Sequence, residues 1–358
     1  MILGVVAFVL YLYFFIGFSN LASVVARVNV SDFILFYSLA IGAMLTVMFL
    51  WVVSWKAILG ALSVKIGLKK AFPYYWVGDF VDLVIPCPGV CGEATRLYLV
   101  HKETKVSYGT VAAAGITNRI VSYTVVTIGL FIGFVYLISN PSVPMFATGF
   151  LFVAWLGALS WLLVLLSLAL SERITKKLAA ILLRVLRTLR MRRYSEGLSP
   201  KTLKSISKFR EGFKFFRKNP RYLIVPFVFQ SLSFTFNLIT YSLVFYSLSS
   251  LGFGNLSIDF FVVIYFVAGA IQDATASFSV GGLEIILTNI FIFYGINPAE
   301  SGVAAVVLRT VTFWFPLIMG YIIIQVIGAR KLLDARTRKA AEIEEEFEEE
   351  DEAVPSQK

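Results

Sequence analysis

The sequence has few of the residues on which many catalytic and metal sites depend. It contains one histidine, His101, and two cysteines, Cys87 and Cys91, among 358 residues. This scarcity argues against a His/Cys metal centre, a disulfide scaffold and most His-dependent catalysis. We therefore predict neither a metal nor a cofactor, and we expect function to depend on carboxylates, arginines and lipid.

Charged residues are also scarce, and they are unevenly distributed. Only 15% of the residues are charged, 58% are hydrophobic, and the mean hydropathy is +0.81. A soluble fold cannot keep so much apolar surface from water, so the composition predicts a polytopic membrane protein. The net charge of +10 includes an acidic run from Glu342 to Glu352. We expect residues 329–358 to form a charged cytoplasmic tail.

Six apolar runs are long enough to cross about 30 Å of hydrocarbon, which takes roughly 20 helical residues. Two further apolar stretches, Ala71 to Val100 and Ile258 to Tyr294, are interrupted by acids and glycines, and the first by prolines too. Each is either a kinked crossing or a re-entrant hairpin. The six predicted spans are Ile2 to Phe18, Phe33 to Leu59, Tyr108 to Ile138, Met145 to Leu170, Tyr222 to Leu251 and Gly302 to Gly328.

The distribution of Lys and Arg favours the hairpins. Residues 171–221 carry sixteen Lys and Arg against three acids, which places this loop in the cytoplasm. Only if both broken stretches return to their own side do the other basic clusters also lie inside. The prediction is an all-α membrane protein with six spans and two re-entrant hairpins, at 71–100 and 258–294. The N- and C-termini of this cell-membrane protein are then cytoplasmic.

This predicted topology is an inverted repeat, an architecture that many secondary transporters share. Residues 1–138 form the first copy; 139–170 begin the second, which 222–328 complete after the basic loop 171–221. A spacing of 11 residues followed by 26 recurs as 11 followed by 25. The residues so spaced are Asp82, Glu93 and Arg119 in the first copy and Asp273, Glu284 and Arg309 in the second.

The tips of the two hairpins are candidate parts of a site. Non-helical backbone at membrane depth must be buried in protein or line a wet cavity, and helix N-termini attract phosphate or carboxylate groups. The predicted tip residues are Pro86, Gly89, Gly92, Gly281 and Gly282.

Ionisable residues at membrane depth are costly and often line a pathway. We predict that a phosphate-bearing lipid headgroup is bound by arginines, whose planar fork suits phosphate, with acids orienting them. The alternative is that the same pairs fasten each hairpin to its neighbouring span. The predicted headgroup-binding residues are Glu93, Arg96, Arg119, Glu284 and Arg309, and the possible ion- or proton-coupling residues are Asp79, Asp82 and Asp273.

The basic loop contains an amphipathic helix that begins at Ser199-Pro200 and stops at Asn219-Pro220. We expect its phenylalanines to lie in the membrane interface and its basic face, within 199–218, to contact anionic lipid. Nucleic-acid binding is not expected. Of the two states open to Cys87 and Cys91, a disulfide or two reduced residues, we expect the reduced pair.

These residues resemble a known family. The run Pro86-Cys-Pro-Gly-Val-Cys-Gly-Glu93-Ala-Thr-Arg96, with Asn118-Arg119 in the next span, resembles the P-x-x-G-x-x-G-E-x-x-R and arginine motifs of flippase-like proteins. These proteins form the family of the transmembrane part of lysylphosphatidylglycerol synthase. Val280-Gly-Gly-Leu-Glu284, followed by Leu308-Arg309, is similar to the family's second motif.

The chain departs from the family pattern in three places. Ser279-Val280 and Leu283 replace a proline and a glycine of the second motif. Asn118 and Ser122 stand where acids often flank the span arginine. The aminoacyl-transferase domain of the bacterial synthases is absent from this sequence, so the resemblance implies binding or movement of a polar-headed lipid and not aminoacyl transfer.

The leading hypothesis is therefore a lipid translocase that is not an enzyme. One alternative is an intramembrane transferase or hydrolase on a lipid-linked substrate, with Glu93 or Asp82 as general base. Another is a lipid-binding scaffold for a partner enzyme that modifies lipids.

Overall fold

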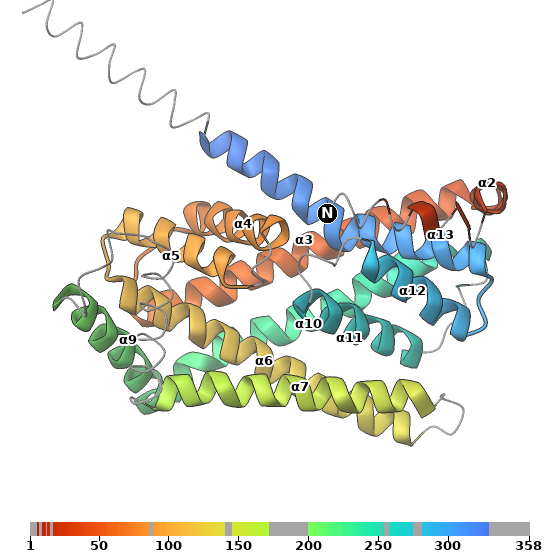
Figure 1. Cartoon of the computed structure of the whole chain (residues 1–358). Coiled ribbons are helices and arrows are strands. Elements are labelled where there is room, and N and C mark those ends of the chain that lie inside the picture. The colour runs from red at the N-terminus through yellow and green to blue at the C-terminus, as the bar shows by residue number, and fades with distance from the viewer. Residues whose placement is uncertain are drawn as a thin grey trace, which may run out of the picture.

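The described part of the chain is helical and contains no strand (Figure 1). The structure is a computed structural model. It describes residues 17–85, 89–139, 145–171, 200–251, 253, 258–274 and 281–328, together with six separate positions before residue 17. The helices are α2 (Phe18–Ala26), α3 (Val30–Ala61), α4 (Leu68–Val84), α5 (Cys91–Thr104), α6 (Tyr108–Ile138), α7 (Met145–Leu170), α9 (Pro200–Lys218), α10 (Ile224–Tyr246), α11 (Ile258–Ala274), α12 (Gly282–Phe293) and α13 (Pro298–Arg309).

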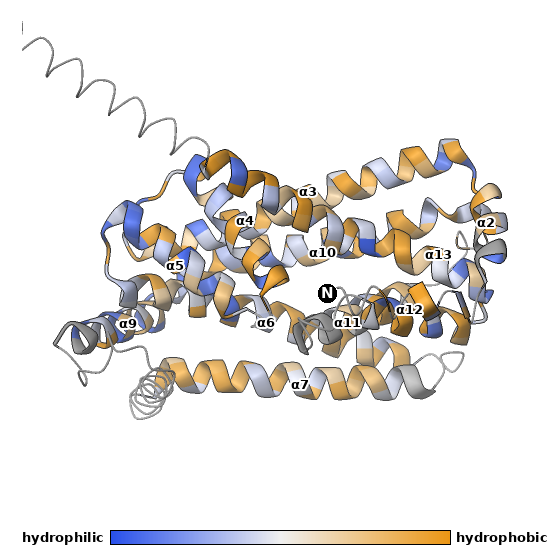
Figure 2. Cartoon of the chain, turned by 45° about the horizontal axis from the view of Figure 1, so that its top comes forward, coloured by the Kyte–Doolittle hydropathy of each residue, from blue (hydrophilic) through white to orange (hydrophobic). Residues whose placement is uncertain are grey.

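Five of the described helices are long and apolar enough to cross a membrane. They correspond to five of the six predicted spans, while most of the first predicted span, residues 2–18, lies outside the described residues. Figure 2 shows apolar residues along these helices and hydrophilic ones gathered on α5, α9 and the ends of the bundle. The five are Val30–Ala61, Tyr108–Ile138, Thr148–Leu170, Pro220–Tyr246 and Pro298–Gly328.

The last long helix is not regular throughout. It starts as α13, passes through a π-helical turn at Thr310–Trp314 and continues to Gly328. Asn297 begins it by accepting a hydrogen bond from the Ala299 amide, and a proline occupies its first turn. A π turn adds a residue to the helical repeat and so re-aims the side chains that follow it.

Each of the two broken stretches folds as a pair of short helices. The helices α4 and α5 pack along each other, and α12 packs against α13 and α11. The two pairs lie toward opposite ends of the long helices (Figure 1). Gly89 adopts a φ of 67° between α4 and α5, and Gly281 a φ of 84° before α12. Glycine reaches these left-handed angles without steric cost, which explains its presence at both turns.

The predicted amphipathic helix exists as α9, and it ends at Lys218 before Asn219-Pro220. Its packing corrects one expectation, because Phe213 and Phe216 are buried in protein and do not face the membrane interface. Phe216 joins a core cluster with α3 residues such as Trp55. A Cβ at Gly109 of α6 would overlap Ser205 of α9, so the two helices approach closely at a glycine.

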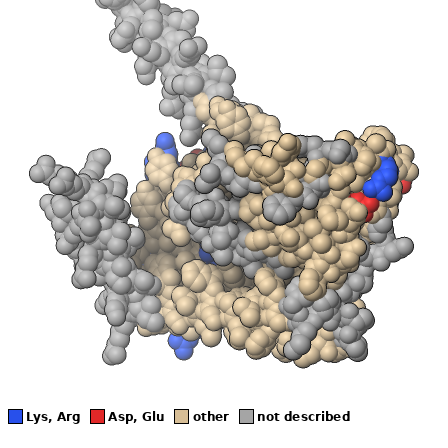
Figure 3. All heavy atoms as spheres, turned by 45° about the vertical axis from the view of Figure 1, so that its right-hand side comes forward, with Lys and Arg blue, Asp and Glu red and all other residues tan. Residues whose placement is uncertain are grey.

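One face of the described part of the molecule is largely uncharged away from its margins (Figure 3). Figure 3 shows one broad face on which most of the charged side chains that are drawn lie at the edges. Such a surface suits contact with hydrocarbon, since charges in that region would be costly. Among the described residues, the charged side chains that are buried inside the bundle are Arg96, Glu284 and Arg309.

Candidate functional site

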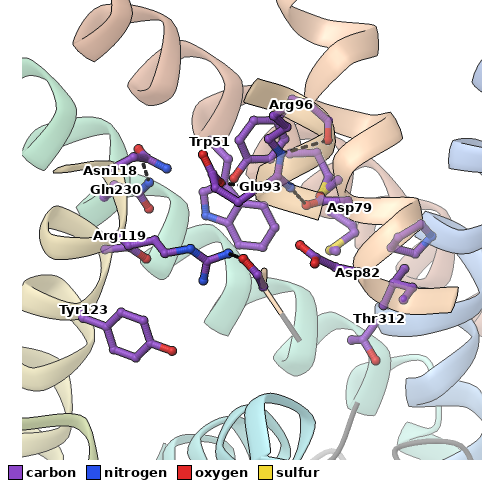
Figure 4. A pocket seen from close by; sticks show the side chains of 17 residues that line it. Trp51, Asp79, Asp82, Glu93, Arg96, Asn118, Arg119, Tyr123, Gln230 and Thr312 are labelled. Carbon is purple, nitrogen blue, oxygen red and sulfur yellow. Dashed lines mark hydrogen bonds and ion pairs between the residues drawn. The ribbon is translucent and has the colours of Figure 1, made fainter. Parts of the chain in front are cut away.

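The described part of the chain contains a partly open cavity of about 280 Å³ beside the first helix pair. Met48 and Trp51 of α3, Arg119 of α6, Gln230 of α10 and Thr312 of the last helix contribute to its wall. Figure 4 shows side chains from all these helices converging on one space. The acids and cations that line the cavity are Asp79, Asp82, Glu93, Arg96 and Arg119.

Arg96 lies on one side of the cavity and is fully engaged. Its Nη1 donates to Glu93 Oε2 at 3.1 Å, its Nη2 pairs with Asp79 Oδ1, and its Nε donates to the Tyr75 carbonyl at 3.3 Å. The guanidinium also stacks 4.2 Å from the centre of the Tyr75 ring. Only 4% of Arg96 is exposed, so its charge is neutralised within the protein and ties α5 to α4.

Asp82 has a structural role. Its Oδ1 accepts a hydrogen bond of 2.7 Å from the Gly92 amide, in the first turn of α5. The first amides of a helix have no carbonyl acceptor within the helix, and Asp82 supplies one. A carboxylate at this end also interacts favourably with the helix dipole. Asp82 therefore joins the end of α4 to the start of α5.

Small residues allow this part of the bundle to pack closely. A Cβ at Gly92 would overlap both Asp82 Oδ2 and the Gly78 carbonyl, and one at Gly115 of α6 would overlap Glu93 Oε1. Gly78 and Gly92 thus set the distance between α4 and α5. Gly115 lets the Glu93 side chain lie against α6.

Arg119 differs from Arg96 because it retains donors that can serve a ligand. Its Nη2 donates to the carbonyl oxygen of Gly89 at 2.5 Å, and no described carboxylate lies within ion-pair distance of it. The side chain is half-buried and lines the cavity, with its guanidinium extended toward the hairpin turn (Figure 4). Since a guanidinium has five N–H donors, most of its hydrogen-bonding capacity remains open.

The second half of the chain places its acid and arginine elsewhere. Arg309 Nε donates to Glu284 Oε1 at 3.1 Å, and Glu284 Oε2 accepts from the Gly281 amide at 2.7 Å. Both residues are buried, with exposures of 2% and 4%, and Arg309 stacks 4.5 Å from the Phe313 ring centre. Neither lines the cavity. The pair joins the start of α12 to the end of α13.

The structure thus brings together one part of the predicted site and not the whole. The five predicted acids and arginines of the first half line the cavity together with Gly89. Glu284 and Arg309 form a separate buried pair, and the Gly281 amide donates to Glu284. Gly92 lies behind the cavity wall and Gly282 opens α12. Pro86 lies outside the described residues, as does the side chain of Asp273 on α11.

The state of the cysteines differs from the sequence-based expectation. Cys91 is disulfide-bonded, so the expectation of a reduced residue is wrong at this position, while Cys87 lies outside the described residues. His101 lies in the last turn of α5. Its ring stacks on Tyr108 with centroids 3.8 Å apart, away from the cavity.

Sequence reasoning did not predict the neutral polar part of the wall. Gln230 and Thr312 line the cavity, and Asn118 and Ser122 do so beside Arg119. A single amide inside the apolar run of α10 was the available signal for Gln230. No group of three or more His, Cys, Asp or Glu side chains within the described ranges is placed to hold a metal ion.

The comparisons with known proteins agree with this architecture. Residues 1–320 match the family described as the lysylphosphatidylglycerol synthase TM region. A UPF0104 membrane protein of Pyrococcus horikoshii is 24% identical over 79% of this chain and 84% of its own. Another, from Methanocaldococcus jannaschii, is 23% identical over 89% of this chain and 92% of its own. No solved structure matches.

Proposed function

Because the chain belongs to the lysylphosphatidylglycerol synthase TM region family and is an integral, multi-pass membrane protein, we propose that it is a lipid translocase. It takes a phosphate-bearing headgroup into the cavity and passes it between leaflets while the acyl chains stay in the bilayer. Arg119 is the residue that binds the phosphate.

The observation that carries this proposal is the environment of Arg119. Two cations line the cavity, and Arg96 is neutralised by Asp79 and Glu93. No described carboxylate neutralises Arg119, and its side chain lines the cavity. A planar guanidinium with unused donors suits a phosphate, to which it can donate two parallel hydrogen bonds.

The arrangement of the helix pairs supports the proposed topology of six spans and two re-entrant hairpins. By its 17 residues α4 is about 26 Å long, and by its 14 residues α5 is about 21 Å long. Each is shorter than the roughly 30 Å of a hydrocarbon core, which suits a hairpin that enters and returns. An inverted pair of such hairpins would give a headgroup access from both sides.

The orientation follows the same proposal. With α9 in the cytoplasm, the N- and C-termini lie on that side, as does the open end of α4 and α5. The exposed side chains of α9 include Lys204, Lys208, Lys214, Arg217 and Lys218. We expect this basic face to contact anionic lipid headgroups, at about 1 kcal/mol for each cation near the surface.

A transport assay in proteoliposomes tests the proposal. Vesicles of phosphatidylglycerol and phosphatidylcholine carry a trace of phosphatidylglycerol labelled with a fluorophore on one acyl chain, and a membrane-impermeant reductant bleaches the outer leaflet. Wild-type protein should deliver inner-leaflet probe outward faster than protein-free vesicles do. Arg119→Ala should fall to the protein-free rate, and Arg119→Lys should retain part of the activity.

The matched control is Arg27→Ala. Arg27 is an exposed arginine that pairs with Glu300 at 2.9 Å, far from the cavity, so its loss should leave transport unchanged. Arg119→Ala at the wild-type rate would refute the proposed role. Mass spectrometry of the recovered lipids separates the alternatives, because a transferase or hydrolase changes lipid mass. A scaffold changes neither mass nor sidedness.

A further inference from the structure

Two buried amides beside Arg119 carry an inference about the substrate, and it rests on the function proposed above. We propose that Asn118 and Gln230 recognise a hydroxyl group of the lipid headgroup, so that the cavity selects hydroxylated phosphate headgroups, of glycerol or sugar type, over quaternary ammonium ones. The inference concerns specificity, whereas the proposed function concerns the phosphate.

The amides are held in a network that joins three long helices. Asn118 Oδ1 on α6 accepts from Ser54 Oγ on α3 at 3.3 Å and from Gln230 Nε2 on α10 at 3.4 Å. Asn118 is 8% exposed and Gln230 is 4% exposed, and both line the cavity. Figure 4 shows the two amides joined to each other on the same side of the cavity as Arg119.

This network leaves one donor and one acceptor at the cavity wall. Asn118 Nδ2 and Gln230 Oε1 make no hydrogen bond with any described residue, yet neither is sealed away from accessible space. The assignment of amide nitrogen and oxygen does not affect this conclusion. If both amides were reversed, the hydrogen bond between them would persist, and one donor and one acceptor would still face the cavity.

A hydroxyl group complements such a pair because it both donates and accepts a hydrogen bond. A trimethylammonium group does neither, so it would leave two buried polar groups without partners. Sites built to bind a hydroxyl discriminate strongly against analogues that lack one, for this reason. The hydroxyls of Ser122, Tyr123 and Thr312 also line the cavity and add to its neutral polar surface.

The position of the amides and the size of the cavity agree with a hydroxylated headgroup. Arg119, Asn118 and Gln230 all line the same cavity, so the ester substituent of a phosphate bound at Arg119 shares this space with the two amides. The cavity of about 280 Å³ has room for roughly nine water molecules, which suits a phosphate with a small polyol. The Trp51 ring, also in the wall, offers an apolar surface to the carbon atoms of such a polyol.

The test compares two acyl-labelled probes, phosphatidylglycerol and phosphatidylcholine, in the proteoliposome assay. Wild-type protein should move phosphatidylglycerol at least about tenfold faster, a ratio that corresponds to one unsatisfied polar group. Gln230→Met keeps the side-chain size and removes the amide, and it should lower this ratio to about one without slowing phosphatidylcholine. Asn118→Asp should shift the preference toward phosphatidylcholine, because it adds an anion where a donor stood.

The control is Asn289→Ala on α12, which removes an exposed amide bonded to Tyr11 and should keep the wild-type ratio. If wild-type protein moved both probes at the same rate, and faster than protein-free vesicles do, the inference would be overturned and translocation would stand. The inference would also be overturned if the Gln230→Met protein kept the wild-type ratio of phosphatidylglycerol to phosphatidylcholine rates, or if it moved both probes more slowly by the same factor. Arg119→Ala should instead abolish the movement of both.

Binding provides a second measurement that does not depend on transport. The shift in thermal unfolding of detergent-solubilised protein on adding each short-chain lipid should be larger for phosphatidylglycerol with wild-type protein and equal for the two with Gln230→Met. If wild-type protein moves neither probe but still shows this difference, translocation fails and the specificity holds. Equal shifts with wild-type protein would refute the specificity.

Discussion

The two halves of the chain contain an arginine at corresponding places in the predicted repeat, and they use it differently. Arg119 is half-buried, lines a cavity and donates to a backbone carbonyl. Arg309 is 2% exposed and pairs with the Glu284 carboxylate. Arg119 therefore has hydrogen-bond donors that can reach a ligand, whereas Arg309 is held in a buried ion pair.

The two halves also differ in which cation pairs with the glutamate. In the first half Arg96 lies three residues after Glu93 on α5 and pairs with it, so Glu93 does not need Arg119. In the second half the residue three after Glu284 is Leu287, which is fully buried. The nearest cation for Glu284 is then Arg309 on the next helix. Glu93 is thus paired within its own helix, whereas Glu284 pairs with the arginine of the next helix.

Removing one partner of the buried pair should give the largest effect. Arg309→Ala leaves Glu284 charged and unpaired at 4% exposure, which we expect to cost about 3–5 kcal/mol of stability. Thermal unfolding monitored by size-exclusion chromatography measures the loss. The double variant Arg309→Met with Glu284→Leu should recover much of it, since apolar residues of similar size often replace a buried pair without loss.

The proposed difference between Arg119 and Arg309 would be contradicted if the Arg309→Ala protein kept the wild-type unfolding temperature but lost transport. Arg309 would then act on the substrate as Arg119 is proposed to do. Wild-type transport by the folded double variant would instead show that the second pair serves stability alone.

A matched pair of glycine substitutions sharpens the contrast between the hairpins. Gly92→Ala should cost about 1–3 kcal/mol, because its Cβ would overlap Asp82 and the Gly78 carbonyl where α4 and α5 meet. Gly282→Ala lies in open space at the start of α12, where it should be neutral or slightly stabilising. Unfolding temperatures of the two variants measured side by side test this. Equal losses would mean that the two hairpins are equally tight.

The smallest effect is expected at the base of the first hairpin. Glu103 accepts hydrogen bonds from Lys70 and Tyr74, and the bond from Lys70 is the main reason that its pKa lies below the usual range for glutamate. A lowered pKa contributes stability above the pKa of the unfolded state, and this is lost as the pH falls through the folded-state value.

For an exposed pair the contribution should be about 0.2–1 kcal/mol. Glu103→Gln should therefore lower stability slightly at pH 7 and converge with wild-type protein as the pH falls below the lowered pKa of Glu103. Glu300→Gln, which removes an acid on a distant pair with Arg27, serves for comparison. A difference between Glu103→Gln and wild type that persists at pH 3 would contradict the ionic explanation.

Much of the fold could be predicted because it depends on local patterns. Apolar runs located five long helices, and the Pro200 and Asn219-Pro220 signals bounded α9. The side of α9 that faces protein could not be predicted, because an apolar helix face suits a membrane interface and a protein core equally. Only the packing at Gly109 and Phe216 decides between them.

The candidate site could be predicted in part for a similar reason. Ionisable residues in apolar runs are conspicuous, so the cavity acids and arginines were found from the sequence alone. Their pairing depends on lateral distances between helices, so the sequence left open whether Arg309 binds a headgroup or pairs with Glu284, and the structure shows the pair. A neutral amide such as Gln230 gives a weaker signal, since single amides in helices are common without being functional.

The most direct test of the central claim is a structure of the protein in lipid nanodiscs with phosphatidylglycerol bound. We predict density for a phosphate within hydrogen-bonding distance of Arg119, in the cavity between α3, α6 and the first hairpin, with Arg309 still paired to Glu284. A phosphate between Arg309 and Glu284, with an empty cavity at Arg119, would contradict the account.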